Sequence, residues 1–395
     1  MAVNTTDQYI ALHILNHWYQ KYNHQVIEIS GTIGTGVDKV ISQFIEYQEF
    51  DPREVMYLSL DQKQVLELAY KRFHAYYLNS IIYKYIREVC FDTLPVFNPN
   101  SKILEARIER RVRKKLPDDR YRLMIVYDSV LLSKEMIEDL MSFGLPIILV
   151  RDPYLIPAKD PYVFLREPEI QLRDPDPIET RDPITFFARQ LLDDNKPAIG
   201  TYDNVSIISK KNLNLYNFRS ADMMITLTHE TASDINHLYR ERILRIDDTR
   251  NVPGERMIAL STLYTEKLVN EDEKHVKVFL TKGIVGTLSK CPRHALSTKY
   301  IPVDFKPEFY HESFEEIYID RFYLNNMDNT PSRQQVPDEI LYVGYAYALQ
   351  VSLARLSHWD KVVLMLDYPD VDQDVYRSML YTAVTRCKSA LTIVV

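Results

Sequence analysis

The sequence predicts an α/β protein whose strands form parallel sheets. Val26, Ile27 and Ile29 are typical of a buried strand, a Gly-rich turn follows, and apolar residues then recur at helical spacing over 40–45. A second apolar strand at 55–60 and a helix at 62–73 complete a β-α-β pattern, which is typical of parallel sheets. Residues 345–395 alternate helix and strand again, so the same architecture is expected at the C-terminal end.

Composition limits the class of protein. A chain of 395 residues with 46% hydrophobic residues is expected to fold into two or three globular domains. No apolar run reaches the ~18–20 residues of a membrane span, and basic residues interrupt the first 25, so we expect neither a membrane protein nor a signal peptide. The cysteines Cys90, Cys291 and Cys387 are odd in number and widely spaced, which indicates a reducing cytoplasm. Cys291 and His294 lack a second ligand pair, so no metal site is predicted.

The first residues predict an amphipathic helix over 6–19, in which Ile10, Ile14 and Trp18 repeat every four residues. The Gly-rich turn then has the outline of a phosphate-binding loop, because Gly31 and Gly36 have the spacing of G-x-x-x-x-G-K-[ST]. In such a loop backbone amides hold phosphate, the Lys contacts its oxygens and the hydroxyl binds Mg²⁺.

The two positions that carry this chemistry are occupied by Val37 and Asp38. An ordinary Gly turn before a helix is the alternative interpretation, with Asp38 favoured at a helix N-terminus by the helix dipole.

One segment is strongly basic. Residues 101–116 predict a helix with Leu104, Ile108 and Val112 on its apolar face, and the other faces carry seven cations against two glutamates. In a chain of net charge −7 this is a local patch, interpreted either as a solvated helix face or as a surface for phosphates or an acidic partner.

The middle of the chain contains a second indication of a ligand-binding site. Residues 122–158 predict a buried strand ending at Asp128, a helix over 133–143 and a second buried strand over 146–150. An Asp at the carboxyl end of a parallel strand lies at the ligand crevice of an open α/β sheet, and in P-loop enzymes it binds Mg²⁺. The proline-rich residues 153–183 exclude a long helix and are interpreted as a crossover between domains.

The remaining elements predict a second α/β region interrupted by strands. They are a helix near 183–194, strands near 205–209 and 223–226, a helix over 231–244, a small β domain from 284 to 330, a buried helix over 345–356, a strand over 362–366, a helix over 375–385 and a final strand, LTIVV.

The order of these segments resembles the superfamily 1B helicases of the RecD-like and phage Dda-like group. The resemblance is carried by TDQYIA, YDSVLLSKEMIEDLMSFGLPIILVRDPYLIP, GERMIALSTLY, KGIVGTL, YAYALQVSLARLSHWDKVVLMLD and LYTAVTRCKSALTIV. It implies two RecA-like P-loop NTPase domains with parallel sheets, and an SH3-like β insertion in the second. The implied boundaries are 1–160 for the first domain, with a small basic insertion at about 85–120, 161–283 and 340–395 for the second, and 284–339 for the insertion.

The resemblance also implies a vestigial nucleotide site, with Gln8 in the adenine-reading position. Its residues are Gln8, Gly31, Gly34, Thr35, Gly36, Val37, Asp38, Asp128, Ser129 and Arg386. Val37 and Asp38 replace the Lys and hydroxyl, Ser129 replaces the general-base Glu, Leu155 and Ile170 replace a Gln and an Arg, and residues 352–356 depart from the family's pattern.

An Arg that contacts the γ-phosphate is worth about 10³ to 10⁵ in rate. Asp38 adds a repulsion of about 4 kcal/mol toward a phosphate at 4 Å and an effective dielectric of ~20. Lys39 lies half a helical turn beyond the Lys position and is directed elsewhere. We therefore expect no catalytic residues, no cofactor and no metal.

The function predicted is a DNA- or protein-binding subunit of a replication, recombination or viral complex that has lost ATP hydrolysis and unwinding. An active ATP- and Mg²⁺-dependent helicase is the alternative, with Lys63 or Arg386 reaching the phosphate. An unrelated hydrolase or metal enzyme is disfavoured because no Gly-x-Ser-x-Gly elbow or paired ligand motif is present. The predicted contacts to single-stranded DNA or a protein partner are Ser59, Asn79, Ser80, Arg107, Arg110, Arg111, Lys114, Lys115 and Trp359.

Overall fold

The structure is a computed structural model that describes residues 4–21, 24–88, 107–113, 116, 118–157, 167–192, 198–246, 252–270, 273–291, 300–308, 313–320, 340–355 and 357–395. The chain forms two compact units. Unit 1 comprises Met1–Asn79, Lys114–Asp234 and Ala348–Val395, and unit 2 comprises Ser80–Arg113 and Ile235–Tyr347. Among the described residues, no helix has the length and apolar character needed to cross a bilayer.

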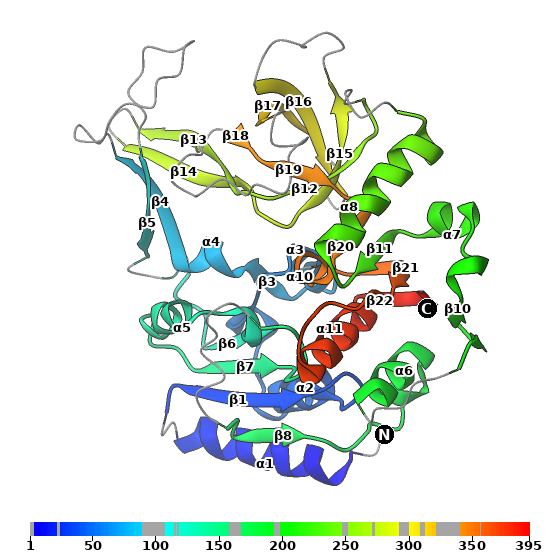
Figure 1. Ribbon diagram of the computed structural model, residues 1–395. Helices are drawn as coiled ribbons and strands as arrows, with labels where there is room; N and C mark the ends of the chain where they lie inside the picture. Colours follow the sequence, from blue (N-terminus) through cyan, green and yellow to red (C-terminus); the bar gives the residue numbers. More distant parts are fainter. Residues whose placement is uncertain are drawn as a thin grey trace. The chain divides into compact units, whose positions relative to one another are not determined.

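The first lobe of unit 1 is a six-stranded sheet in the order β3-β2-β6-β7-β1-β8, with every pair parallel (Figure 1). Its strands are β1 (Val26–Gly31), β2 (Val55–Ser59), β3 (His74–Tyr77), β6 (Leu123–Val126), β7 (Ile147–Arg151) and β8 (Ile170–Leu172). Its helices are α1 (Thr6–Lys21), α2 (Val37–Tyr47), α3 (Gln62–Tyr70) and α5 (Lys134–Met141), with 3-10 turns η1 (Pro52–Glu54) and η2 (Ser129–Leu131).

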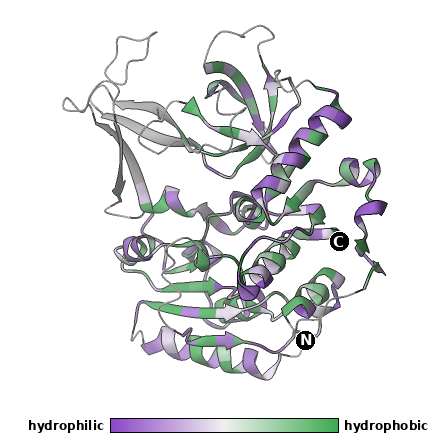
Figure 2. Ribbon diagram, viewed as in Figure 1, coloured by the Kyte–Doolittle hydropathy of each residue, from purple (hydrophilic) through white to green (hydrophobic). Residues whose placement is uncertain are grey.

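The core of the first lobe explains the apolar patterns in the sequence. Ala11, Leu15 and Trp18 of α1 pack in one cluster with Val40, Ile41 and Phe44 of α2 and with the sheet. Figure 2 shows β1 and β7 hydrophobic over most of their length. A sheet covered on its faces requires such continuous apolar strands.

The second lobe of unit 1 has the order β20-β11-β21-β22-β10-β9, with only β9 antiparallel among these described strands. Its strands are β9 (Gly200–Tyr202), β10 (Val205–Ile208), β11 (Met223–Thr226), β20 (Ala348–Gln350), β21 (Trp359–Met365) and β22 (Cys387–Val394). Its other elements are η4 (Glu179–Arg181), α6 (Pro183–Leu192), η5 (Lys210–Asn212), α7 (Leu215–Ser220), α8 (His229–Leu238), α10 (Val351–Ala354) and α11 (Gln373–Thr385). The predicted α/β class with parallel sheets is thereby confirmed.

Unit 2 consists mainly of β-strands. One sheet has the order β18-β17-β16-β15-β12-β19 and the other the order β13-β14-β4-β5. The strands are β4 (Tyr83–Glu88), β5 (Arg107–Val112), β12 (Arg256–Ala259), β13 (Leu263–Asn270), β14 (Glu273–Leu280), β15 (Val285–Lys290), β16 (Tyr300–Pro307), β17 (Phe314–Asp320), β18 (Ile340–Leu341) and β19 (Val343–Tyr345). The short helix α4 (Leu78–Ile82) leads into β4, and a π-helical turn, Tyr239–Leu244, follows α8.

Three expectations about elements and boundaries need correction. The β region begins at Arg256 rather than at 284, because β12 pairs with β15 on one side and β19 on the other. Strand β8 pairs with β1, so it extends the sheet of the first lobe beyond the boundary placed at 160. The segment 345–356 is not one helix but β19, β20 and the short α10, since a run buried on all sides carries no periodicity that separates helix from strand.

The basic helix predicted over 101–116 is also wrong where the structure describes it. Residues 107–112 form strand β5, which pairs antiparallel with β4 from Glu88 opposite Arg107 to Tyr83 opposite Val112. Backbone pairing with a neighbouring strand outweighs a helix propensity worth only tenths of a kcal/mol per residue. Residues 101–106 and Lys114 and Lys115 lie outside the described residues.

Candidate functional site

The loop between β1 and α2 has the strand, turn and helix order of a phosphate-binding loop. Gly34 and Gly36 both have positive φ, 80° and 76°, and Gly36 directly precedes the first turn of α2. A Cβ at Gly36 would lie 2.4 Å from Nε2 of Gln8, so only glycine fits there. Thr35 is fully buried and its hydroxyl donates to the carbonyl of Thr32 at 2.7 Å. The predicted loop is therefore present and tightly constrained.

A polar network of this chain's own side chains covers the loop. Gln8 is fully buried, and its Nε2 donates to the carbonyl of Thr35 at 2.9 Å and to Oδ2 of Asp176 at 3.1 Å. Nζ of Lys39 lies 2.8 Å from the same Asp176 oxygen and 3.2 Å from Oε1 of Gln8. Gln8 thus uses both ends of its amide within the protein, and Lys39 is directed at Asp176.

Asp176 is the centre of this network. Burial raises the pKa of its carboxyl group, but hydrogen bonds from Lys39, Gln8 and the amides of Ile178 and Glu179 outweigh that effect and hold the pKa well below its ordinary value. The buried charge is therefore fully compensated.

A second carboxylate binds the loop directly. Oε2 of Glu179 accepts the backbone N–H of Gly36 at 3.1 Å. Burial and the nearby Asp38 and Asp176 raise the pKa of Glu179, although the Gly36 amide opposes this. Amides of a glycine loop at a helix N-terminus are the groups that such loops offer to phosphate oxygens. In this chain one of these amides is already bound by a carboxylate oxygen.

Asp38 occupies the position where a phosphate-binding loop has its Mg²⁺-binding hydroxyl. Asp38 is exposed, and its Oδ1 accepts the hydroxyl of Tyr127 at 2.9 Å. Burial and the adjacent Asp38 raise the pKa of Tyr127, so this contact joins a carboxylate to a neutral phenol. The loop therefore faces anions on two sides.

Helix α11 of the second lobe binds the same loop. The hydroxyl of Tyr381 accepts the backbone N–H of Ile33 at 2.9 Å and donates to Oδ2 of Asp152 in a short hydrogen bond. Next to it, the hydroxyl of Thr382 accepts the N–H of Ile156 at 3.0 Å. Burial raises the pKa of Asp152 to about 7. These bonds connect both lobes of unit 1 at the loop.

The two surviving charged positions of the vestigial site lie near one another. Asp128 follows β6 with a left-handed backbone, φ 50°, a conformation that Asp tolerates better than most residues. Loss of hydration raises its pKa, and the positive charge of Arg386 opposes the rise. Nη1 of Arg386 donates to the carbonyl of Arg355 at 3.0 Å, while Ser129, in the general-base position, is fully buried.

A second set of contacts between the lobes involves His358. Its Nε2 lies 2.8 Å from Oε1 of Glu67 and its Nδ1 lies 3.3 Å from Oδ2 of Asp61. Nζ of Lys388 lies 2.6 Å from both oxygens of Glu67, and Nζ of Lys63 donates to the His358 carbonyl at 2.5 Å. Lys63 is thus engaged by the His358 carbonyl. No motif in the sequence predicts this cluster, because its members lie on separate elements.

The predicted contacts to nucleic acid do not form one surface in unit 1. Ser59 is fully buried and its Oγ accepts the N–H of Asp61 at 2.9 Å. Trp359 is only 3% exposed on β21, so the expected stacking platform is absent there; a Trp in a covered strand is packed into the core. Asn79 is half-buried and donates to the hydroxyl of Tyr77 at 3.3 Å, whereas Ser80 is exposed and belongs to unit 2. In unit 2, Arg107, Arg110 and Arg111 lie on β5.

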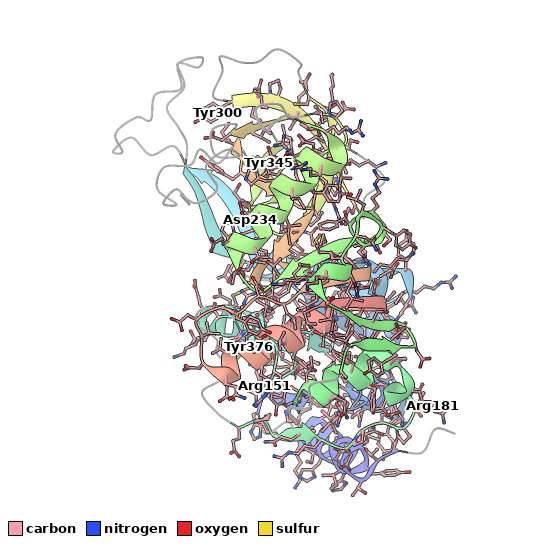
Figure 3. All side chains as sticks on the ribbon, turned by 45° about the vertical axis from the view of Figure 1, so that its right-hand side comes forward. Arg151, Arg181, Asp234, Tyr300, Tyr345 and Tyr376 are labelled. Carbon is pink, nitrogen blue, oxygen red and sulfur yellow. The ribbon has the colours of Figure 1, made fainter. Side chains whose placement is uncertain are left out.

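Arg151, labelled in Figure 3, belongs to the structural part of the first sheet. It ends β7, and its Nε lies 3.0 Å from Oε1 of Glu28 on β1, with both side chains at least nine-tenths buried. Among the described residues, no group of three or more His, Cys, Asp or Glu side chains is arranged to hold a metal ion.

Comparisons with known proteins give structural matches only. No family model and no curated protein matches the sequence. The Pif1 helicase from Bacteroides in complex with ADP-AlF3 and single-stranded DNA is 12% identical, with 99% of this chain and 92% of that chain covered and a TM-score of 0.43. The Pif1 helicase from Candida albicans is 11% identical, with coverage of 100% and 94% and a TM-score of 0.45. The PRRSV helicase is 10% identical, with coverage of 98% and 54% and a TM-score of 0.35. At these values the similarity assigns no activity or ligand to this chain.

Proposed function

We propose that this chain is a helicase-fold protein that neither hydrolyses ATP nor unwinds DNA, and that it serves as a binding subunit of a replication, recombination or viral assembly. The observation that carries the proposal is the hydrogen bond from the Gly36 amide to Glu179, beneath the network of Gln8, Lys39 and Asp176. A nucleotide phosphate would have to displace a carboxylate that is already seated on the loop.

The residues that phosphoryl transfer requires are also missing. Val37 and Asp38 provide neither a cation nor a hydroxyl, and Ser129 is a buried hydroxyl where a general base is needed. The cations near the loop are engaged by groups of this chain: Lys39 by Asp176, Arg189 by the Thr32 hydroxyl and the Ile33 carbonyl, and Lys63 by the His358 carbonyl. We infer that the protein works without nucleotide or Mg²⁺.

A titration with a fluorescent ATP analogue and Mg²⁺, with and without single-stranded DNA, tests this proposal. We expect no saturable binding at millimolar nucleotide and no hydrolysis above background in either condition. DNA-stimulated turnover that disappears on Asp128→Ala would establish the alternative, an active helicase with a divergent loop, and would overturn the proposal.

Single-stranded DNA is the ligand we propose for the basic segment. Arg107, Arg110 and Arg111 lie on β5, which ends the described sheet β13-β14-β4-β5, and Lys114 and Lys115 follow directly in sequence. A cationic segment in a chain of net charge −7 concentrates attraction for phosphates at one place.

Anisotropy of a labelled oligonucleotide tests the DNA proposal. Reversal of Arg110, Arg111, Lys114 and Lys115 to Glu should weaken binding, with each lost phosphate contact lowering the salt slope by about 0.7. Reversal of Lys210 and Lys211, exposed on η5, should leave binding unchanged, and reversal of Lys114 and Lys115 alone is the variant with the same change in charge. Equal loss in both variants would refute the assignment, and binding confined to an acidic protein would replace DNA as the partner.

A further inference from the structure

Helix α1 has one face that the vestigial nucleotide site does not use. Its inward face carries Gln8, Ala11, Leu15 and Trp18, all buried, over a helix of 16 residues. The outward face carries the exposed residues Thr6, Tyr9, Ile10, His13 and His17. Two histidines four residues apart therefore project from the same side of the helix.

The imidazole rings of His13 and His17 are neighbours. Their ring centroids are 6.4 Å apart and the ring planes are inclined by 24°. A metal ion binds imidazole nitrogen at about 2.0–2.1 Å, which brings two ligating nitrogens to roughly 3 Å of each other. Because both side chains are exposed, rotation between ordinary rotamers brings the nitrogens to this spacing without moving the backbone.

We propose that His13 and His17 form a two-ligand site for a divalent transition metal. Imidazole suits Cu²⁺, Ni²⁺ and Zn²⁺, and the general order of affinity places Cu²⁺ first. Since no larger group of potential ligands exists among the described residues, the remaining coordination positions are open to water or to a donor from a second molecule. This differs from a structural zinc site, in which four protein ligands close the metal off.

The packing of α1 holds the two histidines in register. Nε1 of Trp18 donates to the carbonyl of His24 at 2.7 Å, beyond the C-terminal end of the helix, and Gln8 joins its first turn to Thr35 and Asp176. Most helical stability in proteins comes from tertiary packing, so these contacts supply the helical geometry before metal binds.

Titration of the full chain, without any affinity tag, with Cu²⁺ and Ni²⁺ tests the site. Calorimetry gives the affinity, and electron paramagnetic resonance of the Cu²⁺ complex shows whether two nitrogens ligate. We expect one site, with affinity lowered more than tenfold by either His13→Asn or His17→Asn because each removes the chelate. His24→Asn, also exposed but outside the helix, is the matched control and should leave binding unchanged.

Relocation of one ligand distinguishes a chelate from loose surface binding. In a His17→Asn background, Tyr9→His restores a spacing of four residues to His13, whereas Thr6→His places the new ligand seven residues away, about 10.5 Å along the helix. Both replaced side chains are exposed. Binding should return with Tyr9→His and not with Thr6→His. Absence of binding in the native chain, or equal binding in the two relocated variants, would refute the site.

Discussion

Replacement of Asp176 by Ala tests the network that covers the glycine loop. Its carboxylate accepts from Lys39 Nζ, Gln8 Nε2 and the amides of Ile178 and Glu179, and only 1% of its side chain is exposed, against 18% for Lys39. The substitution removes the carboxylate that these donors share and the anion that pairs with the largely buried Lys39. Breaking a buried ion pair from one side costs about 3–5 kcal/mol, so we expect a loss of that order in the free energy of unfolding.

The same carboxylate makes a signed contribution to pH dependence. Its pKa is depressed in the folded state, so the stability it provides is present above the unfolded value of about 3.9 and is lost as pH falls toward the folded pKa. A fall in pH should therefore destabilise the native chain more steeply than it destabilises the Asp176→Ala variant.

Urea unfolding followed by circular dichroism provides the measurement. Asp174→Ala is the matched control, because Asp174 lies two residues away and is exposed, and it should change stability by less than about 0.5 kcal/mol. If Asp176→Ala costs under 1 kcal/mol, or if its acid sensitivity equals that of the native chain, the network contributes little and the reasoning is wrong.

Three further outcomes follow from the loop and from two other buried carboxyl groups. Combined Val37→Lys, Asp38→Thr and Ser129→Glu should not restore ATP hydrolysis, because the Gly36 amide remains bound by a carboxylate; measurable turnover in a phosphate-release assay would contradict this. Burial raises the pKa of the Asp152 carboxyl to about 7, so between about pH 4 and 7 the folded state keeps a proton that the unfolded state has released, and the stability of the native chain should fall as pH rises. Asp152→Asn should remove this fall. Thermal melts with the same pH dependence in the native chain and the variant would count against it. Arg240→Met should cost about 3–5 kcal/mol, because it removes the cation that pairs with Glu255, whose carboxylate is fully buried; native-like stability of the variant in urea unfolding would contradict this.

The fold class could be predicted because its signals are local. The strand at Val26, the glycine loop and the helix after it each depend on residues adjacent in sequence, and the structure has all three. Strand β5 could not be predicted in the same way. Its residues have good helix propensity, and what makes them a strand is β4, which lies about twenty residues earlier in sequence.

The sequence predicts which functional residues are missing from the candidate site, but not which residues contact one another there. The sequence alone shows that Val37, Asp38 and Ser129 lack the groups that phosphoryl transfer requires, whereas the contacts of Lys39 with Asp176 and Gln8 are found only in the structure. Nothing local indicates that Asp176 and Glu179 bind the loop, because they are about 140 residues further along the chain. Trp359 was misassigned for the related reason that a strand sequence does not tell whether its aromatic residue faces solvent or core.

The hydrogen bond between Glu179 and Gly36 also determines which group a dissolved anion must displace in order to bind the loop. A carboxylate attached to the same chain has an effective concentration that is millimolar even for a flexible tether, and many orders of magnitude higher when the geometry is well oriented. Any dissolved anion must compete with this intramolecular ligand, however abundant the anion is. Under the proposed function, this competition would lower the dependence of loop occupancy on the supply of nucleotide, and a binding partner would encounter the same surface over a wider range of nucleotide concentrations.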